Sequence, residues 1–202
     1  QQEAKAFLQA AIGHRLEALF VLALTTGARQ GELLGLRWDR VDLDNGHIDI
    51  RQALQRIDGR FQLVEPKTSS SARRVALTDI AVEALRHHHT RQLKEALRLG
   101  QAWDNDMNLV FCTTIGSPLD KANVTRRELR SVLRHAGLTP QLRFHDLRHI
   151  SASLALGEGM SVTSVSEMLG HSSPATTLRV YAHAIPGADR LVADALQNLL
   201  AS

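Results

Sequence analysis

The sequence is poor in several residue types, and each scarcity narrows what the protein can be. Its one cysteine, Cys112, cannot form a disulfide within the chain, and it lies in the apolar run LVFC, where we expect a small core residue. Only 4% of the 202 residues are aromatic, and Tyr181 is the only tyrosine. No apolar run approaches the ~18 residues of a membrane-spanning helix. We therefore expect a protein of a reducing cytoplasm, without a disulfide framework or a membrane anchor.

Lysine is also scarce. It occurs only at positions 5, 67, 94 and 121, so most of the 24 basic residues are arginines. Arginine suits bidentate contacts with phosphate, and the bias points weakly towards nucleic acid. The net charge of +3 is modest, however, and a solvated surface in an arginine-preferring organism explains the composition equally well.

Hydrophobic periodicity predicts an α+β protein that is mostly helical and forms one domain over 1–202. Alternating segments predict a small three-stranded antiparallel sheet from 47–50, 61–64 and 73–77, with turns at Asn45-Gly46 and Asp58-Gly59. The chain starts partway into a probable helix, so we expect a fragment of a longer protein. The helices are expected at 3–12, 14–26, 79–99, 120–135, 145–157, 161–169, 174–181 and 188–200.

The segment from His145 to Tyr181 carries the residues that most strongly suggest chemistry. His145 and Arg148 are three residues apart, so on a helix both leave one face near its amino terminus, where an anion is favoured. His171 and the lone tyrosine Tyr181 follow. A phosphodiester repels nucleophiles, and its displacement needs cations and hydrogen-bond donors around the non-bridging oxygens. Arg148 and the two histidines are such donors.

Three further residues could belong to the same site. Arg29 begins a helical turn, and Glu32, three residues later, could pair with it and fix the guanidinium. An ordinary surface ion pair is the alternative interpretation. Lys67 falls where a strand gives way to the Thr68–Ser71 connection, which would place it at a hairpin tip. A solvated lysine is the usual fate of that residue type.

Other charged positions support weaker hypotheses. Arg127, Arg130 and Arg134 share one helical face, which is typical either of a stripe that follows a nucleic-acid backbone or of a solvated surface. The run His87 to His89 suggests a metal, but consecutive helical side chains point about 100° apart and cannot close one coordination sphere. We expect no metal site there.

Four motifs in a fixed order resemble the tyrosine recombinases, and within them the phage and conjugative-transposon integrases. They are TGARQGELLGLRW (26–38), PKTSSSARRV (66–75), RFHDLRH (143–149) and LGHSSPATTLRVYAH (169–183), and together they cover nearly the whole chain. The interval of ten residues from His171 to Tyr181 is one longer than in many members and resembles transposon-type integrases.

The resemblance implies the tyrosine-recombinase catalytic fold and a role for each site residue. Tyr181 would attack the scissile phosphate to form a 3′-phosphotyrosine, and no metal or cofactor would be needed. The other implied roles are phosphate clamps at Arg29 and Arg148, proton transfer at Tyr181 by His145, a phosphate hydrogen bond from His171, protonation of the leaving 5′-oxygen by Lys67, and orientation of Arg29 by Glu32.

The resemblance also implies the partners. We expect double-stranded DNA attachment sites, a homotetramer on DNA, accessory DNA-bending or excisionase proteins, and a location in the cytoplasm of a bacterial host, associated with the nucleoid. The amino-terminal DNA-binding domains of longer integrases would be absent. DNA contacts are expected from Arg73, Arg74, Arg127, Arg130, Arg134 and Arg143.

Three alternatives remain open. A non-enzymatic helical DNA-binding module would explain the arginines but not the ordered Lys67, His145, His171 and Tyr181. A zinc protein could use His145 and His149, although HDLRH lacks the glutamate of HExxH. A type I topoisomerase shares the chemistry of a recombinase.

The carboxyl-terminal segment poses a separate question. Residues 188–200 form an amphipathic stripe, so the segment 187–202 is expected to dock either on its own domain or in trans on a neighbouring protomer.

Overall fold

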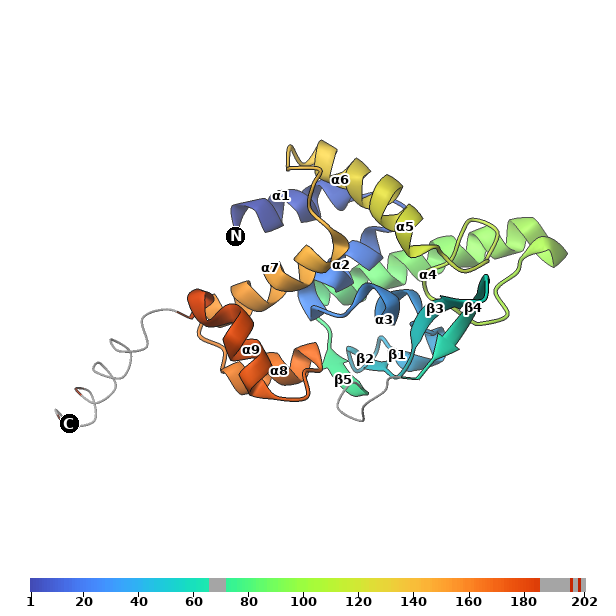
Figure 1. The fold of residues 1–202 in the computed structure, drawn as a ribbon. Coiled ribbons are helices and arrows are strands. Elements are labelled where there is room, and N and C mark those ends of the chain that lie inside the picture. Colours follow the sequence, from blue (N-terminus) through green and yellow to red (C-terminus); the bar gives the residue numbers. More distant parts are fainter. Residues whose placement is uncertain (66–71, 186–196, 198–199, 201–202) are drawn as a thin grey trace.

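Helix α2 (Glu17–Thr26) is the centre of the fold in the computed structural model, which describes residues 1–65 and 72–185 together with 197 and 200. Eight of its ten residues are buried, as its uniformly apolar sequence predicts. It packs against the long helix α4 (Asp79–Leu99) on one side and against α7 (Phe144–Gly157) on another (Figure 1). These three helices hold the chain's largest hydrophobic cluster together.

Helix α1 (Gln2–Ala11) lies beside α6 (Arg130–His135) along one side of this core (Figure 1). The helix expected at 120–135 is present but irregular: it starts as α5 (Lys121–Asn123), passes through a π-helical stretch η4 (Val124–Leu129) and continues as α6. Asp120 caps it as expected, because its Oδ1 accepts hydrogen bonds from the amides of Ala122 and Asn123 at 2.9 and 3.1 Å.

The strands form two separate sheets. Strands β1 (Val41–Asp42), β2 (His47–Ile50) and β5 (Arg73–Ala76) pair antiparallel in that order. Strands β3 (Ala53–Ile57) and β4 (Arg60–Val64) form their own hairpin. A three-stranded antiparallel sheet is thus confirmed, but its expected membership was wrong.

The reason is the turn between β3 and β4. Asp58 and Gly59 both have positive φ, at 49° and 79°, which closes a tight hairpin. The segment 61–64 therefore pairs with its immediate neighbour in sequence, and β1 takes its place beside β2.

The remaining helices are α3 (Gln30–Leu34), α8 (Val162–Leu169) and α9 (Pro174–Tyr181), with short 3₁₀ turns η1 (Trp38–Arg40), η3 (Gly100–Ala102) and η5 (Ala182–Ala184). Helices α8 and α9 pack on each other at one end of the molecule, next to α7 (Figure 1). Their apolar contacts form a second, small cluster, which consists of Ala152, Leu156, Val165, Leu169 and Tyr181.

Two expectations fall outside the residues that the structure describes. Lys67 is one of them, and the helix at 188–200 is the other, apart from positions 197 and 200. Across the described ranges, no helix is both long enough and apolar enough to cross a membrane. Cys112 is fully buried in the core, as its apolar surroundings predict.

Candidate active site

Arg29 is fixed at the amino terminus of α3 by Glu32. The Arg29 amide donates to Glu32 Oε2 at 2.8 Å, and its guanidinium Nη1 donates to Glu32 Oε1 at 2.7 Å. The carboxylate therefore caps the helix and orients the arginine side chain at the same time. The predicted pairing of these two residues is confirmed. The Arg29 side chain remains 43% exposed, so its outer face is open to a ligand.

Arg73 also binds Glu32. Its Nη2 lies 3.0 Å from Glu32 Oε2, and its Nε donates to the Met168 carbonyl at 2.7 Å. The Arg73 side chain is only 7% exposed. We expected it at a DNA surface, and the structure places it inside the protein, where it joins β5, α3 and the end of α8.

The alternation of strand β5 explains this placement. Successive side chains of a strand point to opposite faces. Arg74 accordingly faces solvent, with its side chain 64% exposed and its Nε 3.0 Å from Asp49 Oδ1, whereas Arg73 faces the protein. Gly170 makes room for it: a Cβ at this position would lie 2.7 Å from Arg73 Nη1.

Glu32 is ionised between these two arginines. Burial by itself raises the pKa of its carboxyl, but the hydrogen bonds from Arg73 and from Arg29 outweigh it and lower the pKa below the ordinary value. A carboxylate held in this way gives Arg29 a permanent partner at neutral pH.

Arg148 is the buried cation of the site. It lies on α7 with 3% exposure, and it donates from Nη1 to the Gly27 carbonyl at 2.6 Å and from Nη2 to the Leu169 carbonyl at 2.9 Å. These carbonyls belong to the carboxyl-terminal ends of α2 and α8, where the helix dipole favours a cation. Gly27 permits the close approach: a Cβ there would lie 2.6 Å from Leu169 Cδ2.

No carboxylate forms an ion pair with Arg148 among the residues that the structure describes. Burial and then the neighbouring charge of Arg29 lower the pKa of Arg148 to about 10. The guanidinium is thus still charged at neutral pH, but its charge is incompletely balanced. A bound anion would relieve this imbalance.

His171 follows the end of α8. Its Nδ1 lies 2.7 Å from the Thr177 hydroxyl on α9. Burial, followed by the charges of Arg148 and Arg29, lowers the pKa of His171 to about 4. A neutral imidazole whose Nδ1 accepts the threonine hydroxyl carries its proton on Nε2, and that N–H is available to an anion.

Tyr181 ends α9 and is 3% exposed within the small cluster. Burial raises the pKa of its phenol, and the charge of Arg148 partly opposes this increase. Its hydroxyl lies 2.8 Å from His149 Nδ1. We expected His145 at this place, but the contact belongs to His149, the histidine one helical turn later.

His145 itself is exposed on the first turn of α7. Its ring meets that of His149 edge-on, with the centroids 4.7 Å apart. Burial, then the proximity of His149 and of Arg148, lower the pKa of His145. The sequence had suggested His149 only as a zinc ligand, and its spacing of four residues from His145 was the signal that both face the same side.

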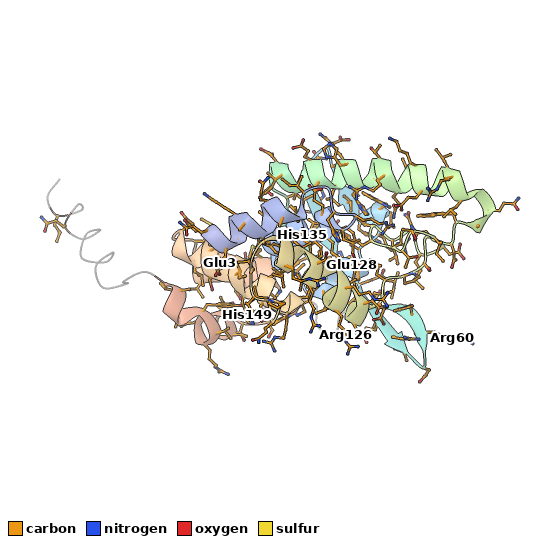
Figure 2. The ribbon with its side chains drawn as sticks, turned by 90° about the horizontal axis from the view of Figure 1, so that it is seen from above. Glu3, Arg60, Arg126, Glu128, His135 and His149 are labelled. Atoms are coloured by element: carbon orange, nitrogen blue, oxygen red, sulfur yellow. The ribbon has the colours of Figure 1, made fainter. Side chains whose placement is uncertain are left out.

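The arginines expected to contact DNA are mostly on the surface. Arg127, Arg130 and Arg134 are all exposed, although the π-helical stretch changes the helical phase between the first and the other two. Arg126 is also exposed and projects from the same helix (Figure 2). Arg143 is 76% exposed and pairs with Asp146 at 3.1 Å.

The three consecutive histidines diverge, as the helical geometry predicts. His88 is buried, with Nε2 2.7 Å from the Val110 carbonyl, whereas the His89 ring lies 4.3 Å from that of Trp38. Within residues 1–65 and 72–185, no three His, Cys, Asp or Glu side chains gather as a metal site would require.

The structure thus brings Arg29, Arg148, His145, His171 and Tyr181 to one region. Two arginines and two histidines supply hydrogen-bond donors beside a single phenol. Such a set can hold a singly charged tetrahedral anion against an oxygen nucleophile.

Comparison with known proteins identifies the family. Residues 1–186 match the phage integrase family. A tyrosine recombinase XerC-like protein of Caldanaerobacter subterraneus subsp. tengcongensis is 34% identical over 98% of this chain and 53% of its own length. The ICEBs1 integrase of Bacillus subtilis is 30% identical over 91% of this chain and 49% of its own length. The chain thus spans about half the length of these curated relatives.

Solved structures agree on the fold. The Tn1549 transposon integrase, in complex with a circular intermediate DNA, superposes with a TM-score of 0.76 at 24% identity, over 95% of this chain and 63% of that one. At this level of identity the likeness shows the fold alone. The match of the family over residues 1–186 shows more: the chain belongs to the phage integrase family.

Proposed function

We propose that this chain is the catalytic domain of a DNA integrase, a site-specific tyrosine recombinase that breaks and rejoins strands through a covalent 3′-phosphotyrosine. The observation that carries the proposal is the buried, incompletely balanced Arg148 guanidinium beside Arg29 and Tyr181. A site that holds unpaired positive charge next to the chain's only tyrosine suits a phosphodiester substrate.

The residues divide the reaction between them. Arg29 and Arg148 hold the non-bridging oxygens of the scissile phosphate, and His171 donates a third hydrogen bond from Nε2. His145, exposed at the amino terminus of α7, faces the same phosphate. The oxygen of Tyr181 attacks phosphorus, the bond to the 5′-oxygen breaks, and that oxygen takes up a proton.

Lys67 supplies this proton by analogy with the family. The covalent link conserves the energy of the phosphodiester, so a 5′-hydroxyl of another strand can reverse the reaction without a nucleotide cofactor. Glu32 and Arg73 support the reaction indirectly, because Glu32 holds Arg29 in position and Arg73 in turn binds Glu32.

The proposed substrate is a double-stranded attachment site. Arg74, Arg127, Arg130, Arg134 and Arg143, all on the surface, would contact its phosphates. We further propose that four copies assemble on DNA, aided by DNA-bending or excisionase proteins, with residues 187–202 docking in trans. The place of action would be the cytoplasm of a bacterial host, at its nucleoid.

A nicked attachment-site duplex tests the proposal. The short strand beyond the cleavage point diffuses away after attack, so a covalent protein–DNA adduct accumulates and survives denaturation. Candidate duplexes come from the junctions between the mobile element that encodes this chain and its host chromosome. The wild type should form the adduct.

Tyr181→Phe is the matched control, because it removes only the hydroxyl. This variant should bind DNA with unchanged affinity and form no adduct. An adduct of undiminished yield would refute Tyr181 as the nucleophile, and DNA binding without any adduct in the wild type would favour a non-catalytic module. Strand exchange between two duplexes, as opposed to relaxation of supercoils, separates an integrase from a topoisomerase.

A further inference from the structure

We infer that His149 is the base that takes the proton from Tyr181, an inference that rests on the proposed function of Tyr181 as nucleophile. The hydroxyl of Tyr181 and Nδ1 of His149 are 2.8 Å apart, which is hydrogen-bonding distance. His149 lies on α7 and Tyr181 at the end of α9, so the packing of these two helices creates the contact.

The direction of this hydrogen bond follows from what the phenol needs. Tyr181 is buried and the pKa of its hydroxyl is raised, so the group keeps its proton at rest and must donate it to an acceptor. In the described part of the chain, the only hydrogen-bond partner of this hydroxyl is His149 Nδ1. Nδ1 is therefore the unprotonated nitrogen, and the ring carries its proton on Nε2.

The proton balance of the step is then complete. As the Tyr181 oxygen bonds to phosphorus, its proton moves to His149 Nδ1 and the imidazole becomes an imidazolium. When the 5′-hydroxyl of the incoming strand attacks, its proton passes to the group that protonated the leaving 5′-oxygen, and the phenolate leaves and takes its own proton back from His149 Nδ1. The resting state is restored without any other reactant, as the reversibility of strand exchange requires.

His145 is less suited to this task. No hydrogen bond joins it to Tyr181 within the described residues, and its ring instead contacts the edge of the His149 ring at 4.7 Å. His145 can still serve the reaction by holding the phosphate and by limiting the rotation of His149. The two histidines thus have different roles, although HDLRH presents them on one helical face.

The charged and titratable neighbours of His149 allow this function. On α7 they are His145, Asp146 and Arg148, and on α9 the neighbour is Tyr181 itself. Asp146 is occupied by Arg143, so it does not compete for the imidazole. Arg148 favours the phenolate that proton transfer creates.

The rate of adduct formation on the nicked duplex, measured under single-turnover conditions from pH 5.5 to 9.5, tests the inference. His149→Asn places an amide near the position of Nδ1 but cannot take up a proton. We expect this variant to react about 10²-fold more slowly at pH 7, the lower bound for general base catalysis. The gap should narrow towards high pH, where phenolate forms without help.

The pH profile distinguishes a base from a structural support. The wild-type rate should fall at acidic pH, because a protonated base can no longer accept the phenol proton, and His149→Asn should lack this fall. DNA affinity should not change. His145→Asn should be slower while it retains the acidic fall, and His87→Asn, which changes an exposed histidine on α4, should behave as the wild type.

Two results would overturn the inference: an unchanged rate and pH profile in His149→Asn, or loss of the acidic fall in His145→Asn alone. A measurement on the unaltered protein guards against misfolding of the variants. Nitrogen-15 NMR of the histidine rings should show Nδ1 of His149 unprotonated, and its shift should change in Tyr181→Phe. A protonated Nδ1 would refute the inference, whereas absence of any adduct in the wild type would count against the proposed function only.

Discussion

Arg29, the proposed phosphate clamp, and Tyr181, the proposed nucleophile, depend on two hydrophobic clusters of very different size. Arg29 and Glu32 sit on α3, which is anchored in the large cluster through Leu33 and Leu34. Tyr181, in contrast, belongs to a cluster of five buried residues on α7, α8 and α9. Regions with few buried contacts open at a lower free energy than the main core. Arg29, the proposed phosphate clamp, is therefore held rigidly, and Tyr181, the proposed nucleophile, lies in the region that opens more easily.

Arg148 and Arg73 join the two regions. Arg148 bonds the carbonyls of Gly27 and Leu169, and Arg73 bonds Glu32 and the Met168 carbonyl. Each arginine thus links the end of α8 to the scaffold beside α3. Arg148 and Arg73 therefore contribute to the anion site and also fix the position of the small cluster relative to the large one.

The largest expected effect comes from the large cluster. Phe20 is fully buried in α2 and touches the rings of Phe7 and Phe144. Phe20→Ala should lower the free energy of unfolding by about 3–5 kcal/mol, because it removes a large side chain and leaves a cavity. Urea denaturation followed by circular dichroism measures this loss, and it should appear in every helix at once.

Leu156→Ala in the small cluster is the counterpart. We expect this substitution to lower the free energy of unfolding by about 2 kcal/mol, the low end for Leu→Ala, because the neighbouring side chains of the small cluster can partly fill the cavity. Hydrogen exchange should quicken in α8 and α9 while α2 stays protected, and the adduct rate should fall with DNA affinity retained. Equal loss of protection in α2 would show that the two regions unfold as one.

A smaller effect is expected at the link between the regions. Arg73→Lys keeps the charge but cannot reach Glu32 and Met168 together. Because lysine keeps the charge, the loss of one hydrogen bond should cost about 1.5 kcal/mol, the low end for bonds to charged groups. Arg29 should lose its fixed orientation as a result. Single-turnover cleavage should slow more than DNA affinity falls. Arg86→Lys, at a 59% exposed arginine on α4, is the control and should leave cleavage unchanged to within about twofold.

The sequence predicts those features of the two regions that depend on local patterns. Periodicity identified the central helices, and the spacing of Arg29 and Glu32 predicted their contact. The sequence did not show that Arg73 is buried and Arg74 exposed, because the buried face of a short strand is decided by the elements that pack against it. The family resemblance implied proton transfer at Tyr181 by His145, and it could not show that His149 makes the hydrogen bond, because the rotation of α7 against α9 is set by tertiary packing.

The smallest expected effect is a pH dependence that belongs to the large region. His88 on α4 is 3% exposed, and burial lowers its pKa from 6.5 to about 4. The unfolded chain then binds more protons than the folded one between these values, so stability must fall as the pH falls from 6.5 towards 4. Its Nδ1 has no hydrogen-bond partner in the described structure, so protonation would leave a buried N–H unpaired.

Between pH 7 and pH 5.5 this single group should cost about 1 kcal/mol of unfolding free energy. His88→Gln keeps a donor to the Val110 carbonyl but cannot titrate, so its stability should decline less over that range, by the same amount. Urea titrations of both proteins at the two pH values give the difference. His171, with a similarly lowered pKa, is more accessible to solvent, and His171→Gln should change this dependence less. A larger change in His171→Gln than in His88→Gln would place the acid sensitivity in the small cluster and reverse the comparison.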